Sequence, residues 1–195
     1  MVVGYHLIWT AYGCWLANDP RGSVSLDLRV PRLVALGEVH YGRKAQQPSS
    51  ATIRTFYQRA DDLLEHQRLT FNDEEIDLIG AGFGRTIRER GYTCYACAVM
   101  PDHVHLLIRR HRHKAEEMIE FLQEDSKRSL IQAKRRPINH PVWGGPGWKV
   151  FLNTREDMER VVRYIRENPP KAGRPEQHWD FAKEYDGWLP RPWRP

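Results

Sequence analysis

Two histidines stand one residue apart in the stretch "MPDHVHLLIRR", at His103 and His105. On a β-strand, side chains two positions apart project to the same face, so these imidazoles would lie about 6–7 Å apart on one surface. Val104, Leu106 and Ile108 would then project to the opposite, apolar face. Such a pair can bind one metal ion, but it also suits two half-exposed polar positions of an amphipathic strand. The pair alone therefore leaves both interpretations open.

A tyrosine and an asparagine form a second candidate cluster near the end of the chain. In "RVVRYIRENPPKAG", Tyr164 and Asn168 are four residues apart, so they share one face of a helix with Arg160. A tyrosine hydroxyl can act as a nucleophile, and an asparagine carbonyl oxygen is a ligand for hard cations. Taken alone, this helix is better explained by a capping asparagine and a tyrosine packed on a sheet. It gains a chemical meaning only in combination with the histidines.

Periodicity and turn residues predict the elements that position these side chains. The predicted elements are a strand at 5–13, helices at 50–68 and 72–91, strands at 92–100 and 103–110, a helix at 114–134, a strand at 148–152 and a helix from 154. Pro101-Asp102 makes a hairpin of the two central strands, and Pro169-Pro170 is expected to stop the last helix. This order favours an α+β fold with a βαββαβ core and a terminal helix.

Size and charge narrow the class of protein. The 195 residues fit one domain, and 30 Lys and Arg against 25 Asp and Glu give a net charge of +5 and a pI near 9.2. This balance suits a polyanionic partner without requiring one. Because no apolar run approaches about 18 residues and the N-terminus lacks a signal-peptide pattern, we expect a cytoplasmic protein without a membrane span.

Cys94 and Cys97 form a C-x-x-C pattern, which raises the question of a zinc or redox site. The pair falls in a predicted strand, where positions three apart point to opposite faces, and no second cysteine pair completes a site. We therefore interpret both as buried apolar side chains.

Together the two polar clusters resemble one known family, the REP-associated tyrosine transposases of the HUH class of single-strand DNA transposases. The matching stretches are "MPDHVHLLI" and "YIRENPPKAG", two distant motifs in the family's order. The opening "YHLIWTAYGCWLANDPRGS" is also similar to the first strand and turn of one branch. The resemblance covers about residues 5–173 of a single domain spanning 1–195, and leaves a tail at 174–195 that is rich in Pro and Trp.

The resemblance implies a ferredoxin-like βαββαβ core, with a central antiparallel sheet, helices on one face and a C-terminal helix that carries Tyr164. It implies that His103, His105 and Asn168 bind Mg²⁺ or Mn²⁺ and that Tyr164 is the catalytic nucleophile. The implied activity is metal-dependent cleavage and rejoining of single-stranded DNA near hairpin or palindromic repeats, through a 5′-phosphotyrosine intermediate. Such a protein takes part in DNA transposition and recombination, as a monomer or a homodimer.

Basic and aromatic side chains are candidates for holding single-stranded DNA. The basic candidates are Arg109, Arg110, Lys127, Arg128, Lys134, Arg135 and Arg136. The aromatic candidates are Trp15, Trp143, Trp148, Trp188 and Trp193. Solvated helix faces and packed tryptophans explain the same residues equally well.

The chain departs from the family pattern at three places. Asp102 stands where relatives often have Asn, Pro170 replaces the usual Val after Asn-Pro, and a long loop occupies residues 18–50. Two competing functions remain open. One is a nucleic-acid-binding module that keeps the fold without cutting DNA, and the other is a metal-dependent hydrolase that does not use Tyr164.

Overall fold

A four-stranded antiparallel sheet forms the centre of the molecule in the computed structural model, which describes residues 1–23, 25 and 30–190. Its strands are β1 (Gly4–Thr10), β2 (Cys94–Val99), β3 (His103–Arg109) and β4 (Trp148–Leu152). They lie in the order β2-β3-β1-β4, and every neighbouring pair is antiparallel. This is the strand order of a ferredoxin-like βαββαβ core, so the predicted fold class is confirmed.

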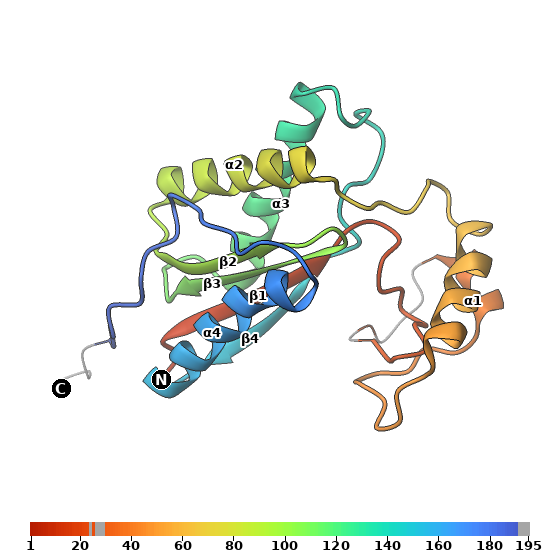
Figure 1. Cartoon of the computed structure of the whole chain (residues 1–195), viewed down its shortest axis with the longest axis horizontal. Coiled ribbons are helices and arrows are strands. Elements are labelled where there is room, and N and C mark those ends of the chain that lie inside the picture. Colours follow the sequence, from red (N-terminus) through yellow and green to blue (C-terminus); the bar gives the residue numbers. More distant parts are fainter. Residues whose placement is uncertain (24, 26–29, 191–195) are drawn as a thin grey trace.

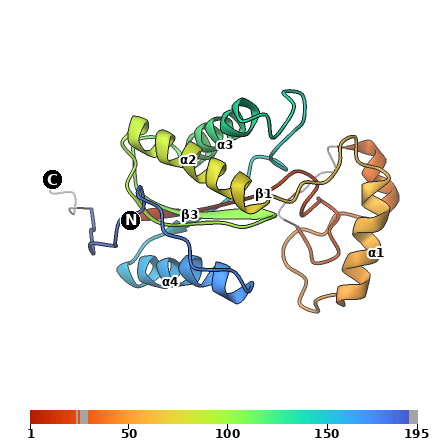
Figure 2. The same cartoon turned by 45° about the horizontal axis from the view of Figure 1, so that its top comes forward.

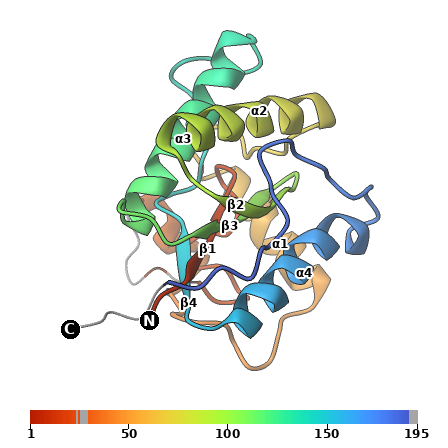
Figure 3. The same cartoon turned by 90° about the vertical axis from the view of Figure 1, so that its left-hand side faces the viewer.

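The helices cover the two faces of the sheet unequally. Figure 3 shows α2 (Asp73–Arg90) and α3 (Ala115–Gln132) on one face and α4 (Arg155–Lys171) on the other. Tyr5, Leu7 and Trp9 alternate along β1 and pack into the core beneath α2 and α3. The smaller core under α4 receives Leu107 from β3. The side chains between Tyr5, Leu7 and Trp9 on β1, and those on the same face of β3 as Leu107, therefore face α4.

Helix α4 is longer than the sequence predicts. Its apolar stripe runs through Val161, Ile165 and Pro169, and the helix ends only at Lys171. The predicted stop at Pro169-Pro170 is wrong, because Pro169 is buried as the next member of this stripe. In the last turn, the backbone N–H of Ala172 donates to the carbonyls of Asn168 and Pro169.

The chain between β1 and α2 forms an insertion at residues 11–72. It contains the 3₁₀ helix η1 (Pro31–Leu36) and helix α1 (Ser50–Asp61), which ends before the predicted residue 68. Just after the helix, the Leu63 backbone N–H donates to the Ala60 carbonyl, an i→i−3 bond of the kind that tightens a last helical turn. Figures 1 and 2 place the insertion beside the end of the sheet where β1 ends and β3 begins.

A β-bulge in β2 changes the orientation of the two cysteines. Cys94 pairs with Ile108 and Ala96 with Leu107, so Tyr95 is an extra residue in the strand. Cys94 and Cys97 consequently pack into the same core, and their expected placement on opposite faces is wrong. Both are buried free thiols, and burial raises the pKa of Cys94 to about 12.

The tail after Gly173 lies against the outer edge of the sheet, at β2. The side chain of Gln177 accepts from the Val99 N–H and donates to the Val99 carbonyl, and the Lys183 N–H donates to the Cys94 carbonyl. Figure 1 shows this segment crossing beside β2 between α2 and α4. Within the described ranges, no helix is long and apolar enough to cross a membrane.

Candidate active site

Three imidazoles gather on the sheet face that α4 covers. His105 on β3 lies directly opposite Ile8 on β1, so the side chains of these two residues project to the same face. His6 stands two positions before Ile8 on the strand and therefore projects to that face as well. The His6 Nε2 atom lies 3.0 Å from His105 Nδ1. The His103 Nδ1 atom lies 2.7 Å from the Asp102 carboxylate. The strand register thus places His6 and His103 around His105.

Tyr164 extends from α4 onto this cluster. Its ring centroid lies 5.4 Å from that of His105 and 5.8 Å from that of His6, both with edge-to-face geometry. The side chain is 46% exposed, so it contacts the imidazoles while remaining open to solvent. The two motifs, about sixty residues apart in sequence, therefore meet at one site.

Asn168 lies one helical turn after Tyr164 and is half-buried. Its Nδ2 donates to the Tyr164 carbonyl at 2.8 Å, along the helix. This bond uses the amide nitrogen, whereas a metal would need the amide oxygen. The expected role of Asn168 as a ligand remains a prediction.

Burial keeps the inner imidazoles neutral. It lowers the pKa of His6 to about 4. It also lowers the pKa of His105 to about 2, with smaller contributions from the neighbouring His103 and His6. Neutral imidazole is the form that binds a metal, because a protonated ring nitrogen has no lone pair.

The hydrogen bonds of His103 and His105 are those expected of two imidazoles that bind a metal. A ligating imidazole usually has its other ring nitrogen engaged by a second group, which fixes the ring. The Nδ1 atom of His103 is engaged by Asp102, and the Nδ1 atom of His105 is engaged by His6. Each ring would therefore present its Nε2 atom to a metal ion. Among the residues that the structure describes, no three His, Cys, Asp or Glu side chains are grouped to hold an ion.

His6 is the site residue that the sequence analysis missed. It lies in the stretch "YHLIWT", which predicts a strand with apolar residues in alternation. A histidine inside such a strand, on a face otherwise suited to burial, is the signal that could have identified it. Its partner could not be identified, because the pairing of β1 with β3 spans about a hundred residues.

The predicted DNA-binding residues lie in two regions away from Tyr164. The first region is the carboxyl end of β3, where Arg109 and Arg110 lie about 20 Å along the strand from His103. The second is the end of α3 and the segment after it, in the layer opposite α4 (Figure 3). This second group comprises Lys127, Arg128, Lys134, Arg135 and Arg136. The fold brings neither region into contact with the histidines.

Three arginines of the second group form ion pairs with acidic side chains. Arg128 pairs with Asp125, and Arg135 pairs with Glu74. Arg136 lies 2.7 Å from Glu75, a carboxylate that is almost fully buried. These contacts explain their positions without DNA, while binding to DNA stays a prediction.

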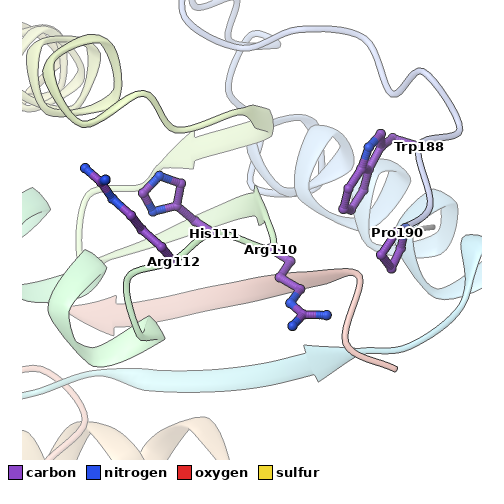
Figure 4. Close-up of a pocket in the computed structure, with 5 residues that line it drawn as sticks. All are labelled: Arg110, His111, Arg112, Trp188 and Pro190. Atoms are coloured by element: carbon purple, nitrogen blue, oxygen red, sulfur yellow. The ribbon is translucent and has the colours of Figure 1, made fainter. Parts of the chain in front are cut away.

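A shallow cavity of about 450 Å³ opens at the far end of β3, beside Arg110. Figure 4 shows Arg110, His111 and Arg112 from the chain after β3, and Trp188 and Pro190 from the tail. The guanidinium of Arg109 lies 4.7 Å over the Trp188 ring. The fold therefore joins basic candidates to one aromatic candidate there.

The other tryptophans differ in exposure. Trp143 packs edge-to-face against Trp9 and Phe71, so its role is in the core. Trp148 is 39% exposed on β4 and Trp15 is 47% exposed in the insertion. Trp193 lies outside the described residues.

The chain belongs to the IS200-like transposase family, because the model of that family matches residues 64–168, more than half of its length. A role as a transposase follows, and the family expected from the two motifs is confirmed at this level. No curated protein sequence matches the chain.

Two solved structures are similar to the chain. One is described as the REP-associated tyrosine transposase bound to a REP hairpin, with 13% identity and a TM-score of 0.46 over 89% of this chain and 70% of that one. The other is described as a transposase from Deinococcus radiodurans R1, with 16% identity and a TM-score of 0.44 over 85% of this chain and 89% of that one.

Proposed function

We propose that this transposase is a metal-dependent endonuclease and strand transferase that acts on single-stranded DNA near hairpin or palindromic repeats. The observation that carries the proposal is the contact of the exposed Tyr164 ring with His105. A tyrosine that reaches both solvent and the His105 ring can meet a phosphate held near that ring.

Tyr164 is the proposed nucleophile. Its hydroxyl oxygen attacks the scissile phosphorus and forms an O–P bond, while the bond to the 3′-oxygen on the opposite side breaks. The phenolic proton is released to solvent and the departing 3′-oxygen takes up a proton. The products are a 5′-phosphotyrosine and a free 3′-hydroxyl. Rejoining reverses these bond changes with the 3′-hydroxyl of another strand.

His103 and His105 are the proposed ligands of Mg²⁺ or Mn²⁺, with Asn168 as the third. When bound, the ion neutralises charge on the non-bridging phosphate oxygens. The protein residues position this chemistry. Asp102 and His6 hold the two proposed ligand rings, and α4 holds Tyr164 against the ring of His105.

Hairpin DNA is the proposed substrate. The net charge of +5 supports a polyanionic partner. The similar structure described as bound to a REP hairpin indicates which kind of DNA should be tried first.

The test uses end-labelled hairpin oligonucleotides with palindromic stems and single-stranded flanks, with Mg²⁺ or Mn²⁺. We expect a covalent protein–DNA adduct that survives denaturation and is lost in Tyr164→Phe. Tyr41→Phe is the matched control, because Tyr41 is 56% exposed in the insertion and does not contact the histidines. This control should form the adduct at the wild-type level.

Three outcomes would reject the proposal in different ways. An undiminished adduct in Tyr164→Phe would exclude this tyrosine as the nucleophile. Tight hairpin binding without any metal-dependent adduct would instead support the non-catalytic binding module. Cleavage that survives the loss of Tyr164 but not of His105 would indicate a hydrolase.

A further inference from the structure

A second cavity, of about 210 Å³, lies next to His103, between the end of the sheet and the insertion. His103 and Asp102 line one side of it. Trp15, Arg21 and other side chains of the insertion line the opposite side. In Figure 1 the insertion stands beside the sheet end where β3 begins. Any group in this cavity is therefore adjacent to the proposed metal site.

The insertion gives the cavity a flat wall. The guanidinium of Arg21 lies 3.9 Å over the Trp15 ring, and this ring is 47% exposed. Planar bases stack on both aromatic rings and guanidinium groups. Trp15 has a backbone φ of 54°, which is costly for a residue with a bulky side chain. Strained positions of this kind concentrate at binding sites.

Hydrogen bonds hold this wall in place. Trp15 donates its backbone N–H to the Tyr57 hydroxyl at 2.8 Å and its indole N–H to the Gly22 carbonyl at 2.9 Å. Arg21 makes two hydrogen bonds to the buried Asp19 carboxylate, at 2.8 and 2.7 Å. The Tyr57 hydroxyl donates to the same carboxylate. The wall is thus rigid before any ligand binds, which reduces the entropy cost of binding.

Charge in the cavity is balanced rather than strongly positive. Asp19 neutralises Arg21, and Arg68 lies 3.2 Å from the Asp61 carboxylate. Asp102 adds an acceptor on the sheet side. A site built mainly for phosphate would carry excess positive charge. Guanidinium donors opposite a carboxylate acceptor, beside a stacking surface, instead match the polar edges and flat face of a nucleobase.

We propose that this cavity binds a single nucleobase of the DNA strand, next to the phosphate that Tyr164 attacks. The proposal rests on the proposed function for the position of that phosphate. The volume is below the range of roughly 300–1,000 Å³ typical of larger ligands, which suits one base. Trp15, Arg21 and Tyr57 precede residue 64, where the match to the family model begins. The insertion therefore supplies the stacking wall of this site, while Asp102 and His103 on its other side lie within the matched segment.

The test is an abasic scan of binding. Hairpin oligonucleotides carry one abasic site at a time along their single-stranded flanks, and fluorescence anisotropy measures their affinity for the full chain. We expect one position at which loss of the base weakens binding about tenfold, since one stacked base contributes on that order.

Two variants connect that position to the cavity. Trp15→Asn removes the ring, and Asn tolerates the left-handed backbone better than most other residues with a side chain. Arg68→Gln removes a second guanidinium from the lining of the cavity. Both should bind the intact oligonucleotide about tenfold more weakly, and the sensitive abasic site should then have no further effect. Phe151→Ala and Arg54→Gln, which change exposed residues outside the cavity, are the matched controls.

The outcomes separate this proposal from the proposed function. If no position is sensitive, or if the abasic site weakens the variants as much as the wild type, the base site is wrong even when the Tyr164 adduct forms. If the coupling is found but no adduct forms, the base site stands and cleavage is wrong. If no oligonucleotide binds, both proposals are wrong. Thermal melting of each variant confirms that it folds.

Discussion

His105 is the most constrained residue of the site. It is only 5% exposed, between His6 at 3.0 Å and the ring of Tyr164. A metal would bind the lone pair on His105 Nε2. In that tautomer His105 Nδ1 carries the ring proton and donates a hydrogen bond to His6 Nε2. In the proposed metal site, His6 would then determine the tautomer of His105 without being a ligand itself. This is a positioning role.

Replacement of His6 tests that role. His6→Leu introduces an apolar side chain of similar size and so removes the acceptor for His105 Nδ1. We expect Mn²⁺ to bind about 10–100 times more weakly, as for other residues that support a ligand. His6→Gln keeps an acceptor and should restore part of the affinity. Titration of Mn²⁺ followed by electron paramagnetic resonance measures the affinity directly.

His178→Leu is the control for this substitution, because His178 is an exposed histidine in the tail. It should leave Mn²⁺ binding unchanged. If His6→Leu binds Mn²⁺ as tightly as the wild type while remaining folded, His6 does not orient His105.

At the scale of elements, α2 and α3 cross closely enough to require a small residue. A Cβ atom at Gly82 would lie 2.7 Å from the Ser126 Cα and 2.9 Å from the Ser126 backbone nitrogen. Backbone atoms of a packed helix cannot move aside as a flexible side chain can. The capping box of Asn72 and Glu75 fixes the start of α2, which limits how far the helix can shift.

Gly82→Ala should therefore destabilise the protein. Alanine gains about 1 kcal/mol of helix propensity over glycine, whereas overpacking costs about 1–3 kcal/mol or more. With contacts to two backbone atoms, we expect overpacking to dominate and the free energy of unfolding to fall by about 1–2 kcal/mol. Urea denaturation measures this change.

Ala81→Ser serves as the comparison, because Ala81 is exposed on the same helix. It should change stability by no more than about 0.5 kcal/mol. A Gly82→Ala protein more stable than the wild type would show that the two helices can separate at little cost.

At the scale of the whole molecule, the tail completes the domain. Its backbone and Gln177 side chain satisfy groups along the β2 edge, which would otherwise be open to pairing with another chain. Phe181 is buried in the main core, and Trp179 packs beside Gly80 of α2. The segment at 174–190 is therefore a structural part of the domain rather than an appendage.

Truncation of one tail side chain tests this conclusion. Phe181→Ala should lower the free energy of unfolding by about 3 kcal/mol, within the range for a buried aromatic residue. Leu189→Ala should have little effect, since Leu189 is 49% exposed. Equal stability of the two variants, measured by thermal and urea denaturation, would mean that the tail does not contribute to the core.

The sequence by itself determined the order of the elements, the face shared by His103 and His105, and the helix of Tyr164. These features follow from local periodicity and turn chemistry, which neighbouring residues encode. It could not determine the β2 bulge or the continuation of α4 through Pro169, because packing against the sheet outweighs the local preference in both.

Only the tertiary structure decided which residues complete the site. His6 meets His105 because β1 pairs with β3 in one register, and a shift of one residue would turn His6 away. Trp15 and Arg21 reach His103 because the insertion packs at the end of the sheet. Such contacts join residues far apart in the chain, and no periodicity within one segment encodes them. The sequence thus predicted the chemistry of the site, and the fold supplied the neighbours of its residues.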